Sequence, residues 1–478
     1  MAVANPSRRP GVDPAQPLAT RPTREEYDRR VTALRAQYGT LPPGSPVRLR
    51  KRTSNLFRPR STAPGTLDAS WFDGVLSVDP DACTADVLGL TTYEHLVDAT
   101  LPYGLMPLVV PQLKTITLGG AVTGLGIESS SFRNGCPHES VVEMDILTGD
   151  GRVVTAAPNG EHQGLFRGFP NSYGSLGYAL RLKIELQPVR PYVHLRHIRF
   201  ADAAGCATAI SEICATGGNR AEYGGEPVDF IDGTWFSLNE CYLTLGSFTD
   251  HAPHLSDYTG QQIYYRSIQQ RGEDWLTTHD YLWRWDTDWF WCSRAFGAQH
   301  PVARRVWPRR WRRSDVYWRL VALNRRFGIS TRIDRQRGKP EQEEVVQDVE
   351  IPVDNMPEFV EFLFARTGIQ PVWLCPLRQR EPGSTWDLYP LDPSVTYVNV
   401  GFWSAAPLPP GRTDGWHNRA IEEKVAQLGG RKSLYSTSFY PEGEFWAIYG
   451  GGTYPALKTT YDPAGRLLDL YAKTVQRR

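Results

Sequence analysis

The sequence lacks the features typical of membrane-spanning, disulfide-stabilised and nucleic-acid-binding proteins. No stretch approaches the roughly 18 apolar residues that a transmembrane helix requires. The seven cysteines, at positions 83, 136, 206, 214, 241, 292 and 375, include no CxxC pair, which favours reduced thiols over a disulfide framework or a zinc site. The 53 Lys and Arg residues nearly balance the 52 Asp and Glu residues, so no net charge attracts nucleic acid. We therefore expect a cytoplasmic protein, soluble or peripheral on the inner face of the membrane, with no metal ion and no nucleic-acid partner.

Length and local composition divide the chain into four parts. At 478 residues the chain can bury more than one core. Residues 1–22 are rich in Pro, Ala and Arg and lack the apolar segment of a signal peptide, so we expect a disordered tail there. The expected parts are an N-terminal tail and helix (1–45), a first domain (46–190), a second domain (191–440) and a C-terminal segment (441–478).

Local patterns predict several secondary-structure elements. Residues 23–38 combine an N-capping Thr23 with apolar residues at helical spacing, so we expect a helix that ends at Gly39. Residues 141–155 predict a hairpin, because alternating apolar residues flank a glycine-containing turn at 149–151. Further expectations are two strands within 75–90, a helix over 93–101, a strand over 180–186, and a turn at Asp462-Pro463 followed by a short helix. This mixture indicates an α+β protein.

The densest signal for ligand binding is the glycine-rich segment 111–135. Glycines at 119, 120, 124 and 126, followed by serines at 129, 130 and 131, leave backbone N–H groups and hydroxyls accessible to a phosphorylated or planar ligand. The spacing from Gly124 to Ser129 only approximates the Rossmann fingerprint, and a purely structural loop is the alternative. The sequence contains no Walker A lysine, HExxH or GxSxG motif, which removes support for P-loop NTPases, zincins and α/β-hydrolases.

The order of motifs resembles the FAD domain of the vanillyl-alcohol oxidase and p-cresol methylhydroxylase superfamily. The motifs are Pro111, TLGG (117–120), Gly135, the 149–151 turn and YGSLG (173–177). A narrower likeness is to delta-24-sterol reductases and bacterial methylene-fatty-acyl reductases, through GIESSS (126–131), TTHDYLWR (277–284), VVQDVEIP (345–352), PVWLCPLR (371–378), LYSTSFYPEGEFW (434–446) and YPALK (454–458). The resemblance implies a two-subdomain FAD-binding domain, an α+β substrate (cap) domain, and a C-terminal segment that returns to the FAD domain.

The resemblance also assigns FAD contacts residue by residue. It implies that the cofactor is lined by Gln112, Thr117, Leu118, Gly119, Gly120, Gly126, Ile127, Ser129, Ser130, Gly177, Tyr178 and Tyr435. The family's first phosphate loop, with its flavin-linking histidine, is reduced here to residues 48–55, which leaves Arg52, Ser54 and Asn55 as expected contacts. We therefore expect non-covalent FAD, with basic residues at the pyrophosphate. Cys136 and His138 are expected to be packing residues. Ser438 stands where related oxidases can carry a lysine, which argues against sugar oxidation.

The implied reaction requires a proton donor. An isolated alkene has no carbonyl to receive charge, so it must be protonated by an acid whose pKa is raised in an apolar pocket. Aromatic faces would stabilise the resulting tertiary cation by about 1–2 kcal/mol. Glu128 is the first candidate acid, followed by His279, Asp280 and Tyr281. The alternatives are that Glu128 only hydrogen-bonds backbone or ribose, and that Asp280 and Tyr281 form a buried structural pair.

The predicted function is FAD-dependent reduction of an isolated double bond in a lipid. A 10-methylene fatty acyl chain, reduced to the 10-methyl-branched chain of the tuberculostearic type, is favoured over a sterol, because no hydrophobic N-terminal anchor like that of eukaryotic sterol reductases is apparent. The alternatives are delta-24-sterol reductase-like activity, a flavin oxidase of an alcohol or lipid-linked sugar, and a non-catalytic lipid-binding protein. The expected electron donor is NADPH, acting at the flavin directly or through a partner protein.

An aromatic and arginine-rich section, residues 275–337, predicts a membrane contact. It interleaves tryptophans at 283, 285, 289, 291, 307, 311 and 318 with arginines at 304, 305, 309, 310, 312, 313, 325 and 326. Indole rings favour the bilayer interface, and each basic residue near an anionic surface contributes about 1 kcal/mol. The alternative is that the aromatic residues form the second domain's core, while the arginines form a solvated face or a homo-oligomer contact.

Overall fold

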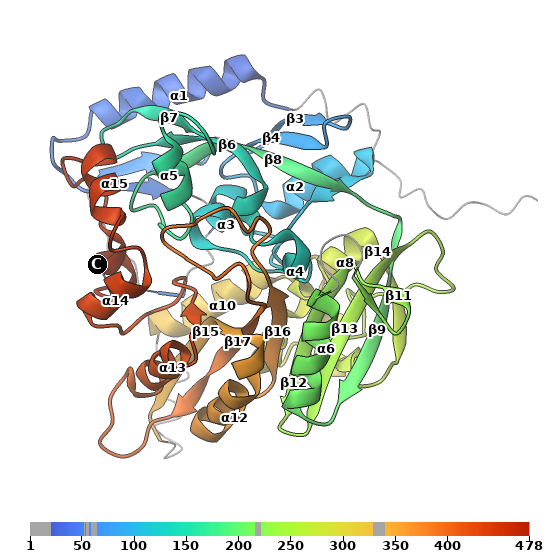
Figure 1. Cartoon of the computed structure of the whole chain (residues 1–478). Coiled ribbons are helices and arrows are strands. Elements are labelled where there is room, and N and C mark those ends of the chain that lie inside the picture. The colour runs from blue at the N-terminus through green and yellow to red at the C-terminus, as the bar shows by residue number, and fades with distance from the viewer. Residues whose placement is uncertain are drawn as a thin grey trace, which may run out of the picture.

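Two antiparallel β-sheets, of six and eight strands, organise the chain into an N-terminal domain and a second domain (Figure 1). The computed structural model describes residues 21–51, 53, 57–58, 65–215, 221–327 and 340–477. Helices flank both sheets, which confirms the α+β class expected from the sequence. Within these ranges, no helix is long and apolar enough to cross a bilayer.

The six-stranded sheet forms the centre of the N-terminal domain. Its order is β3-β4-β8-β6-β7, and β5 also pairs with β8. The strands are β3 Val75–Asp79, β4 Thr84–Leu88, β5 Leu105–Pro107, β6 Val141–Leu147, β7 Val153–Ala156 and β8 Tyr178–Pro188, with a separate parallel pair of β1 Val47–Arg50 and β2 Gly65–Asp68. The helices are α2 Tyr93–Thr100, α3 Leu118–Gly124, α4 Ser131–Asn134 and α5 Gln163–Gly168, with 3-10 turns η2 Leu101–Tyr103 and η3 Pro137–Ser140.

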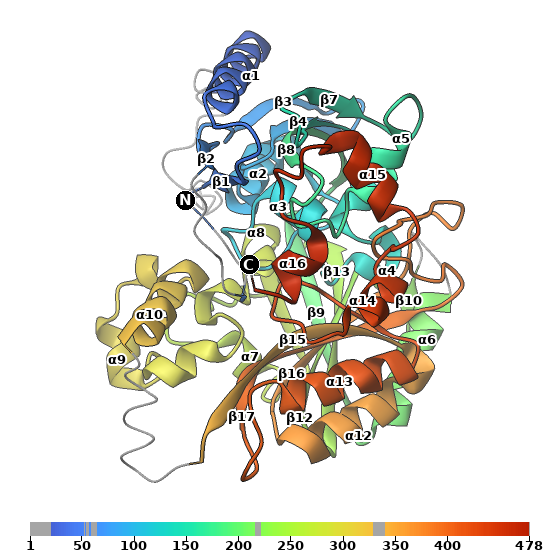
Figure 2. The same cartoon turned by 90° about the vertical axis from the view of Figure 1, so that its left-hand side faces the viewer.

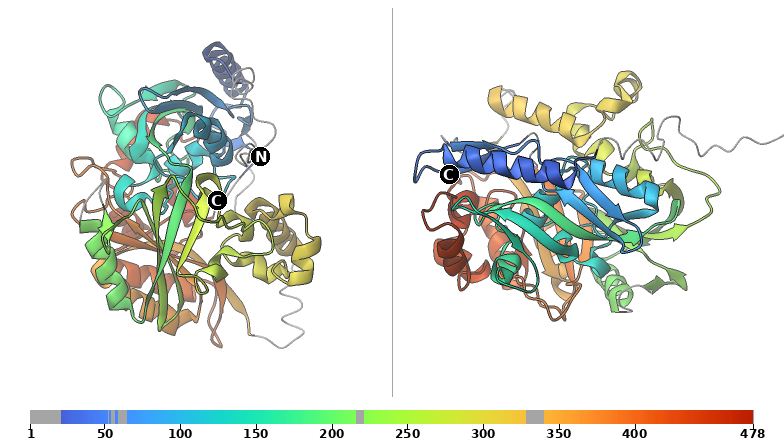
Figure 3. Two further views of the ribbon diagram at one scale, coloured as in Figure 1. Left: turned by 90° about the vertical axis from the view of Figure 1, so that its right-hand side faces the viewer. Right: turned by 90° about the horizontal axis from the view of Figure 1, so that it is seen from above.

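The predicted first helix and the predicted hairpin are both confirmed. Helix α1, Arg24–Gly39, begins after Thr23, whose Oγ accepts a hydrogen bond from Glu26 N at 3.1 Å. Seen from above, it lies along the outside of the N-terminal domain (Figure 3), with Tyr27 and Leu34 buried against the sheet. The β6–β7 hairpin turns through Gly151, whose φ of +83° is a conformation that favours glycine.

The eight-stranded sheet forms the second domain, in the order β14-β9-β13-β12-β16-β17-β15-β18. The strands are β9 Tyr192–Phe200, β12 Phe230–Ser237, β13 Glu240–Thr249, β14 Glu273–Thr277, β15 Gln342–Pro352, β16 Val372–Leu377, β17 Tyr397–Pro407 and β18 Arg431–Lys432; β10 Glu222–Tyr223 and β11 Glu226–Pro227 form a small separate hairpin. Helices α6 Ala203–Ala215, α12 Met356–Thr367 and α13 Trp416–Gln427 cover one face of the sheet (Figure 1). Its other face is turned toward the N-terminal domain.

Between β14 and β15 the chain leaves the sheet and forms a helical projection at one side of the molecule (Figure 2). Its elements are α8 Thr278–Leu282, η5 Asp286–Asp288, η6 Cys292–Phe296, α9 Pro301–Val306, η7 Arg309–Trp311 and α10 Ser314–Phe327, and α7 Tyr264–Ser267 precedes β14. We call residues 301–327 the helical lobe. Tryptophans 283, 285, 289 and 291, which precede the lobe, are less than one-tenth exposed. These four rings belong to the core, which was the alternative interpretation of the aromatic section.

The C-terminal segment returns to the N-terminal domain through three short helices, α14 Glu442–Ile448, α15 Tyr454–Tyr461 and α16 Leu470–Thr474. Lys458 Nζ donates to the carbonyl oxygen of Ser175 at 2.9 Å. The predicted turn at Asp462 is present, and its carboxylate accepts a hydrogen bond from Arg466 N at 2.8 Å. This return places α16 beside the cavity described next.

Candidate active site

A cavity of about 340 Å³ lies between the two domains. The N-terminal domain contributes a glycine-rich wall, the second domain contributes an aromatic wall, and α16 contributes a lysine. A concave site at a domain interface, apolar with a few polar groups, is typical of small-molecule and cofactor binding.

The glycine-rich segment forms its wall because the start of α3 is fixed to the sheet. Thr117 caps the helix, since its Oγ accepts a hydrogen bond from Gly120 N at 3.2 Å. Gly119 N donates to the carbonyl oxygen of Gly89 at 2.9 Å. A Cβ at Gly119 would lie 2.7 Å from that oxygen, so the neighbouring backbone requires glycine at this position. The wall therefore presents backbone with little side-chain cover to the cavity.

Basic side chains gather beside this wall. They are Arg48, Lys51, Arg58 and Lys473. The Arg58 guanidinium lies 4.5 Å from the centroid of the Tyr173 ring, and Lys473 Nζ donates to the carbonyl oxygen of Gly174 at 2.7 Å. Burial and the nearby cations hold the pKa of Lys473 well below its usual value. A bound anion such as a diphosphate would offset this concentration of positive charge.

Aromatic side chains form the wall that the second domain contributes. They are Trp289, Phe290, Trp373, Trp403 and Tyr435. The ring centroids of Phe290 and Trp403 are 4.4 Å apart, and Trp403 Nε1 donates to Tyr435 Oη at 2.8 Å. Trp289 and Phe290 both have left-handed backbone, with φ of +46° and +61°, which is costly for bulky residues. Such strain is concentrated at functional sites, and here it occurs where two rings reach the cavity.

Asp348 brings a carboxyl group to the aromatic wall. It lies on β15 opposite Gly401 of β17, and Gly401 in turn lies opposite Trp373 of β16. A Cβ at Gly401 would lie 2.4 Å from Asp348 Oδ1, so the glycine leaves room for the carboxyl. Burial raises the pKa of Asp348 to about 7, although hydrogen bonds with Tyr435 and Asn399 act to lower it. Asp348 can therefore hold a proton near neutral pH inside an aromatic environment.

Sequence reasoning did not single out Asp348, but the alternation in β15 contains a signal for it. Val345, Val349 and Ile351 pack beneath the covering helices. Asp348 and Glu350 therefore point to the opposite face of the sheet. Glu350 is fully buried there, and burial raises its pKa well above its usual value. Two acidic residues on the face of β15 that is turned toward the N-terminal domain indicate a polar site there.

The FAD contacts implied by the resemblance fall into three groups. Nine of them line the cavity: Gln112, Thr117, Gly119, Gly120, Gly126, Ile127, Gly177, Tyr178 and Tyr435. Leu118, Ser129 and Ser130 are not part of the lining; Leu118 packs in the apolar core, and Ser130 Oγ donates to the carbonyl oxygen of Leu108 at 2.8 Å. Arg52, Ser54 and Asn55 lie outside the described residues.

Glu128 lies behind the cavity wall. Its side chain is buried, and Oε1 accepts hydrogen bonds from Gln112 Nε2 at 2.9 Å and from Ser129 N at 2.8 Å. Burial raises its pKa to about 7, despite the opposing effect of Arg284. Gln112 and Ile127 line the cavity, whereas Glu128 does not. Glu128 therefore has a suitable pKa for an acid but reaches the cavity only through Gln112.

The other three predicted catalytic residues lie on α8, outside the cavity lining. His279 is one-third exposed and faces Asp98 and Asp280; burial lowers its pKa, but hydrogen bonds to these two carboxylates outweigh that effect and raise it to about 9. Tyr281 is buried, and its Oη is 2.8 Å from Ser129 Oγ. The structure thus brings Tyr281 close to the Glu128 backbone segment but places His279 and Asp280 near the surface.

Cys136 and His138 pack in the interior. Both are less than one-tenth exposed and neither belongs to the cavity lining. The His138 ring lies 4.4 Å from that of Trp386, and burial lowers its pKa to about 3. This placement agrees with the expectation that both are packing residues.

The basic group and the two walls suit the parts of one dinucleotide cofactor. The basic group fits a pyrophosphate, and the glycine-rich and aromatic walls fit a planar ring system between the domains. A carboxyl group with a raised pKa beside that ring system is suited to proton transfer. These features define the class of FAD-binding oxidoreductases.

Comparison with known proteins supports this class. Residues 40–157 match the family described as an FAD binding domain. The chain is 23% identical over 451 residues to the Delta(24)-sterol reductase of Arabidopsis thaliana, which covers 86% of this chain and 77% of that protein. It is 25% identical over 403 residues to the Homo sapiens enzyme of the same name, covering 80% and 71%. Cytokinin dehydrogenase 5 of Arabidopsis thaliana is 32% identical over 111 residues, or 23% of this chain and 20% of that protein. The protein is an FAD-linked oxidoreductase with an FAD domain of the vanillyl-alcohol oxidase and p-cresol methylhydroxylase type, and delta-24-sterol reductases are among its relatives.

Proposed function

We propose that this oxidoreductase uses non-covalently bound FAD to reduce an isolated carbon–carbon double bond in a lipid. The substrate we propose first is a 10-methylene fatty acyl chain, which would become the 10-methyl-branched chain. One observation carries the proposal: the carboxyl group of Asp348, with a pKa of about 7, lies within an aromatic wall. The relatives named as sterol reductases support the reduction of a lipid, but not the choice between lipids.

The proposed reaction places a specific demand on the proton donor. Protonation of the terminal CH₂ of a 1,1-disubstituted alkene forms a C–H bond and leaves positive charge on a tertiary carbon. The acid must still carry its proton near neutral pH, which an ordinary aspartate with a pKa near 3.9 does not. Asp348 satisfies this demand, and its hydrogen bond with Tyr435 fixes the carboxyl in the wall.

The aromatic wall contributes to the same step. Ring faces stabilise a desolvated cation by about 2 kcal/mol, and Trp289, Phe290, Trp373 and Trp403 all line the cavity. Bound reduced FAD would supply the hydride that forms a second C–H bond, at the tertiary carbon, and NADPH is the proposed reductant of the flavin. The proton and the hydride together saturate the double bond, and solvent returns a proton to Asp348.

Two alternatives compete with this proposal, one for the substrate and one for the class of reaction. A delta-24 sterol side chain is the second substrate candidate, because the relatives that cover most of the chain carry that name. An oxidase of an alcohol or a lipid-linked sugar is the alternative class of activity. The partial similarity to a cytokinin dehydrogenase covers too little of the chain to favour it.

An anaerobic turnover experiment distinguishes these activities. The purified enzyme is reduced, mixed in D₂O with a 10-methylene acyl phospholipid or a delta-24 sterol, and followed by flavin absorbance and product mass spectrometry. We expect the acyl lipid to reoxidise the flavin and to gain a solvent deuterium on its new methyl group. Reoxidation by the sterol alone would assign the alternative substrate. Failure to consume either alkene, together with rapid flavin reoxidation when oxygen is then admitted, would identify an oxidase.

A further inference from the structure

The helical lobe presents an apolar and basic surface to solvent. Val302, Val306 and Trp311 have exposed fractions of 66%, 76% and 50%, and Arg305, Arg309 and Arg310 are exposed beside them. We call these six residues the lobe face. Residues 301–320 contain seven arginines and a single acidic residue, Asp315. Exposed aliphatic and indole side chains among arginines are the combination that binds the interface of an anionic bilayer.

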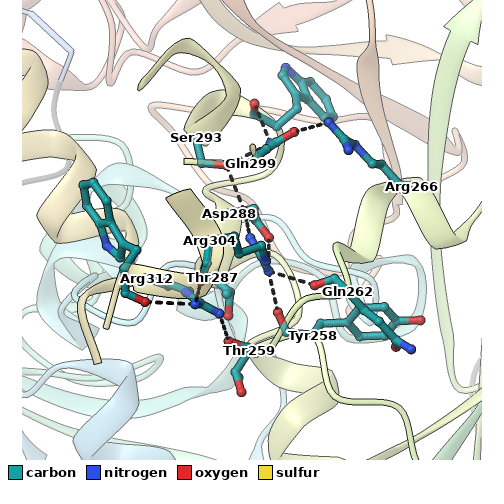
Figure 4. A network of polar contacts seen from close by, with 12 residues as sticks. Tyr258, Thr259, Gln262, Arg266, Thr287, Asp288, Ser293, Gln299, Arg304 and Arg312 are labelled. Carbon is teal, nitrogen blue, oxygen red and sulfur yellow. Dashed lines mark hydrogen bonds and ion pairs between the residues drawn. The ribbon is translucent and has the colours of Figure 1, made fainter. Parts of the chain in front are cut away.

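Two buried arginines of the lobe, Arg304 and Arg312, have a different role, because they anchor it to the rest of the protein (Figure 4). Buried Arg304 pairs with Asp288 at 2.7 Å and donates to the carbonyl oxygen of Gly260 at 2.7 Å. Buried Arg312 donates to the carbonyl oxygens of Thr259 at 2.7 Å and Trp307 at 2.9 Å. These contacts fix α9 and η7 to the 258–262 segment. Buried contacts of Arg304 and Arg312 therefore hold the backbone that carries the lobe face.

Arg313 provides a second anchor. Its guanidinium forms two hydrogen bonds with the Glu94 carboxylate of α2, at 2.8 Å and 2.7 Å. The expectation that all the clustered arginines form one surface is therefore corrected. Arg304, Arg312 and Arg313 make contacts within the protein, because their donors pair with carbonyl oxygens or with the carboxylates of Asp288 and Glu94. The side chains of Arg305, Arg309 and Arg310 are exposed instead.

The lobe is also continuous with the cavity wall. Trp318 of α10 lies with its ring centroid 4.9 Å from that of Phe57 and 6.2 Å from that of Trp289. Phe57 and Trp289 both line the cavity. The helical lobe is therefore in contact with the candidate active site through Trp318.

We propose that the lobe face docks the protein on an anionic phospholipid bilayer, with Val302, Val306 and Trp311 inserted at the interface and the three arginines against the lipid phosphates. Charge complementarity decides the occupant, since the lobe carries arginines in large excess over acids. Each basic residue near such a surface strengthens binding by about fivefold. Arg309 already faces Asp257 at 3.1 Å, so Arg305 and Arg310 together account for at least about 25-fold.

Vesicle co-sedimentation of the full chain with bound flavin tests the proposal. The vesicles contain equal amounts of phosphatidylglycerol and phosphatidylcholine, with pure phosphatidylcholine for comparison. The charge variant is Arg305→Glu/Arg309→Glu/Arg310→Glu, and the apolar variant is Val302→Ser/Val306→Ser/Trp311→Ser. The matched control is Arg24→Glu/Arg29→Glu/Arg35→Glu on α1, where three exposed arginines undergo the same change of charge. Flavin absorbance of each variant verifies that it is folded.

We expect the wild type to bind the anionic vesicles, with binding weakened by added salt and by the absence of phosphatidylglycerol. The charge variant should bind at least about 25-fold more weakly, the apolar variant should also lose binding, and the control should bind like the wild type. Equal binding by the charge variant and the wild type would overturn the proposal, as would an equal loss in the control. A wild-type dimer that ignores vesicles and dissociates in the apolar variant would instead make this face a contact between two copies. The measurement uses neither substrate nor turnover, so it stands apart from the proposed reaction.

Discussion

The substitution Asp348→Asn tests the proton-donor proposal most directly. The amide has nearly the size of the carboxyl and can still accept a hydrogen bond from Tyr435, but it cannot protonate carbon. Loss of a general acid typically slows a reaction by about 10²- to 10⁴-fold. We therefore expect alkene reduction to fall by at least about 100-fold, while FAD binding and flavin reduction by NADPH persist. Single-turnover reoxidation of the reduced flavin by the alkene measures this step separately.

The wild-type enzyme should show the corresponding dependence on pH. Because the pKa of Asp348 is about 7, the protonated form predominates below that pH and becomes scarce above it. The alkene-reduction rate should therefore decline by about tenfold for each pH unit above about 7. The matched control is Glu128→Gln, because Glu128 has a pKa of about 7 but lies behind the wall. It should retain most of its activity and the same pH profile.

The substitution Asp348→Asn should also change the stability of the protein. It should stabilise the folded state, although it should abolish most of the activity. The pKa of Asp348 is raised from 3.8 to about 7, so the unfolded chain releases this proton at a lower pH than the folded protein does. The stability that the protonated Asp348 carboxyl contributes to the wild type is consequently lost as the pH rises from about 4 to about 7. A shift of this size corresponds to about 4 kcal/mol, which is an upper value because the carboxyl borders a cavity. In flavin-free protein, Asp348→Asn should raise the melting temperature increasingly over that pH range.

Two outcomes would refute this reasoning. Full alkene reduction by Asp348→Asn together with an inactive Glu128→Gln would transfer the proton donation to Glu128 acting through Gln112. An unchanged melting temperature for Asp348→Asn across the pH range would show that the carboxyl is not held protonated by burial. Loss of alkene reduction together with a raised melting temperature in Asp348→Asn would agree with both the proton-donor role and the burial of a protonated carboxyl.

Three further predictions concern the cofactor and the shape of the aromatic wall. Lys473→Met should weaken FAD binding by about 10- to 100-fold, the usual loss for a charged hydrogen bond, as measured by flavin fluorescence; Arg152→Met at an exposed site should not, and equal affinities would remove Lys473 from the site. Gly401→Ala should slow alkene reduction with FAD retained, because its Cβ would lie 2.4 Å from Asp348 Oδ1; undiminished turnover would show that the carboxyl does not need that space. Denaturation should release the flavin into solution, and flavin found on the precipitated chain would contradict non-covalent binding.

Some elements could be predicted because their sequence determines them locally. Thr23 caps α1 through its own hydroxyl, and Gly151 permits the positive φ of the β6–β7 turn, so neither element depends on distant residues. Gly119 could also be identified from the sequence, because it belongs to the glycine-rich segment that predicted a binding site. Its N–H donates a hydrogen bond to the carbonyl oxygen of Gly89, and this bond holds the glycine-rich wall in place. In each case the type of residue, a capping threonine or a glycine, indicates the local structure that it forms.

Other assignments required the fold, because their partners lie far away in the sequence. Arg304 and Arg312 have the appearance of surface charges, yet both donate to carbonyl oxygens of the 258–262 segment, more than 40 residues earlier. Asp348 is one of two acids in the string VVQDVEIP. The alternation of side chains along β15 places Asp348 on the other face of the sheet from Val345 and Val349. That face becomes a cavity wall only because the N-terminal domain packs near it.

In the proposed reaction, the second domain would separate proton transfer from lipid access. Asp348 and Gly401 lie on the neighbouring strands β15 and β17 of the eight-stranded sheet, and the hydrogen bonds between these strands fix the backbone that carries the carboxyl group. Trp289, Phe290 and the helical lobe belong instead to the insertion between β14 and β15, whose conformation depends on side-chain anchors such as Arg304. A loop-rich insertion tolerates changes in sequence and length more readily than a strand paired within a sheet does. The nature of the lipid can therefore change through the insertion while the acid stays in place, which reconciles a chemistry supported by the sterol reductases with the different lipid that we propose as substrate.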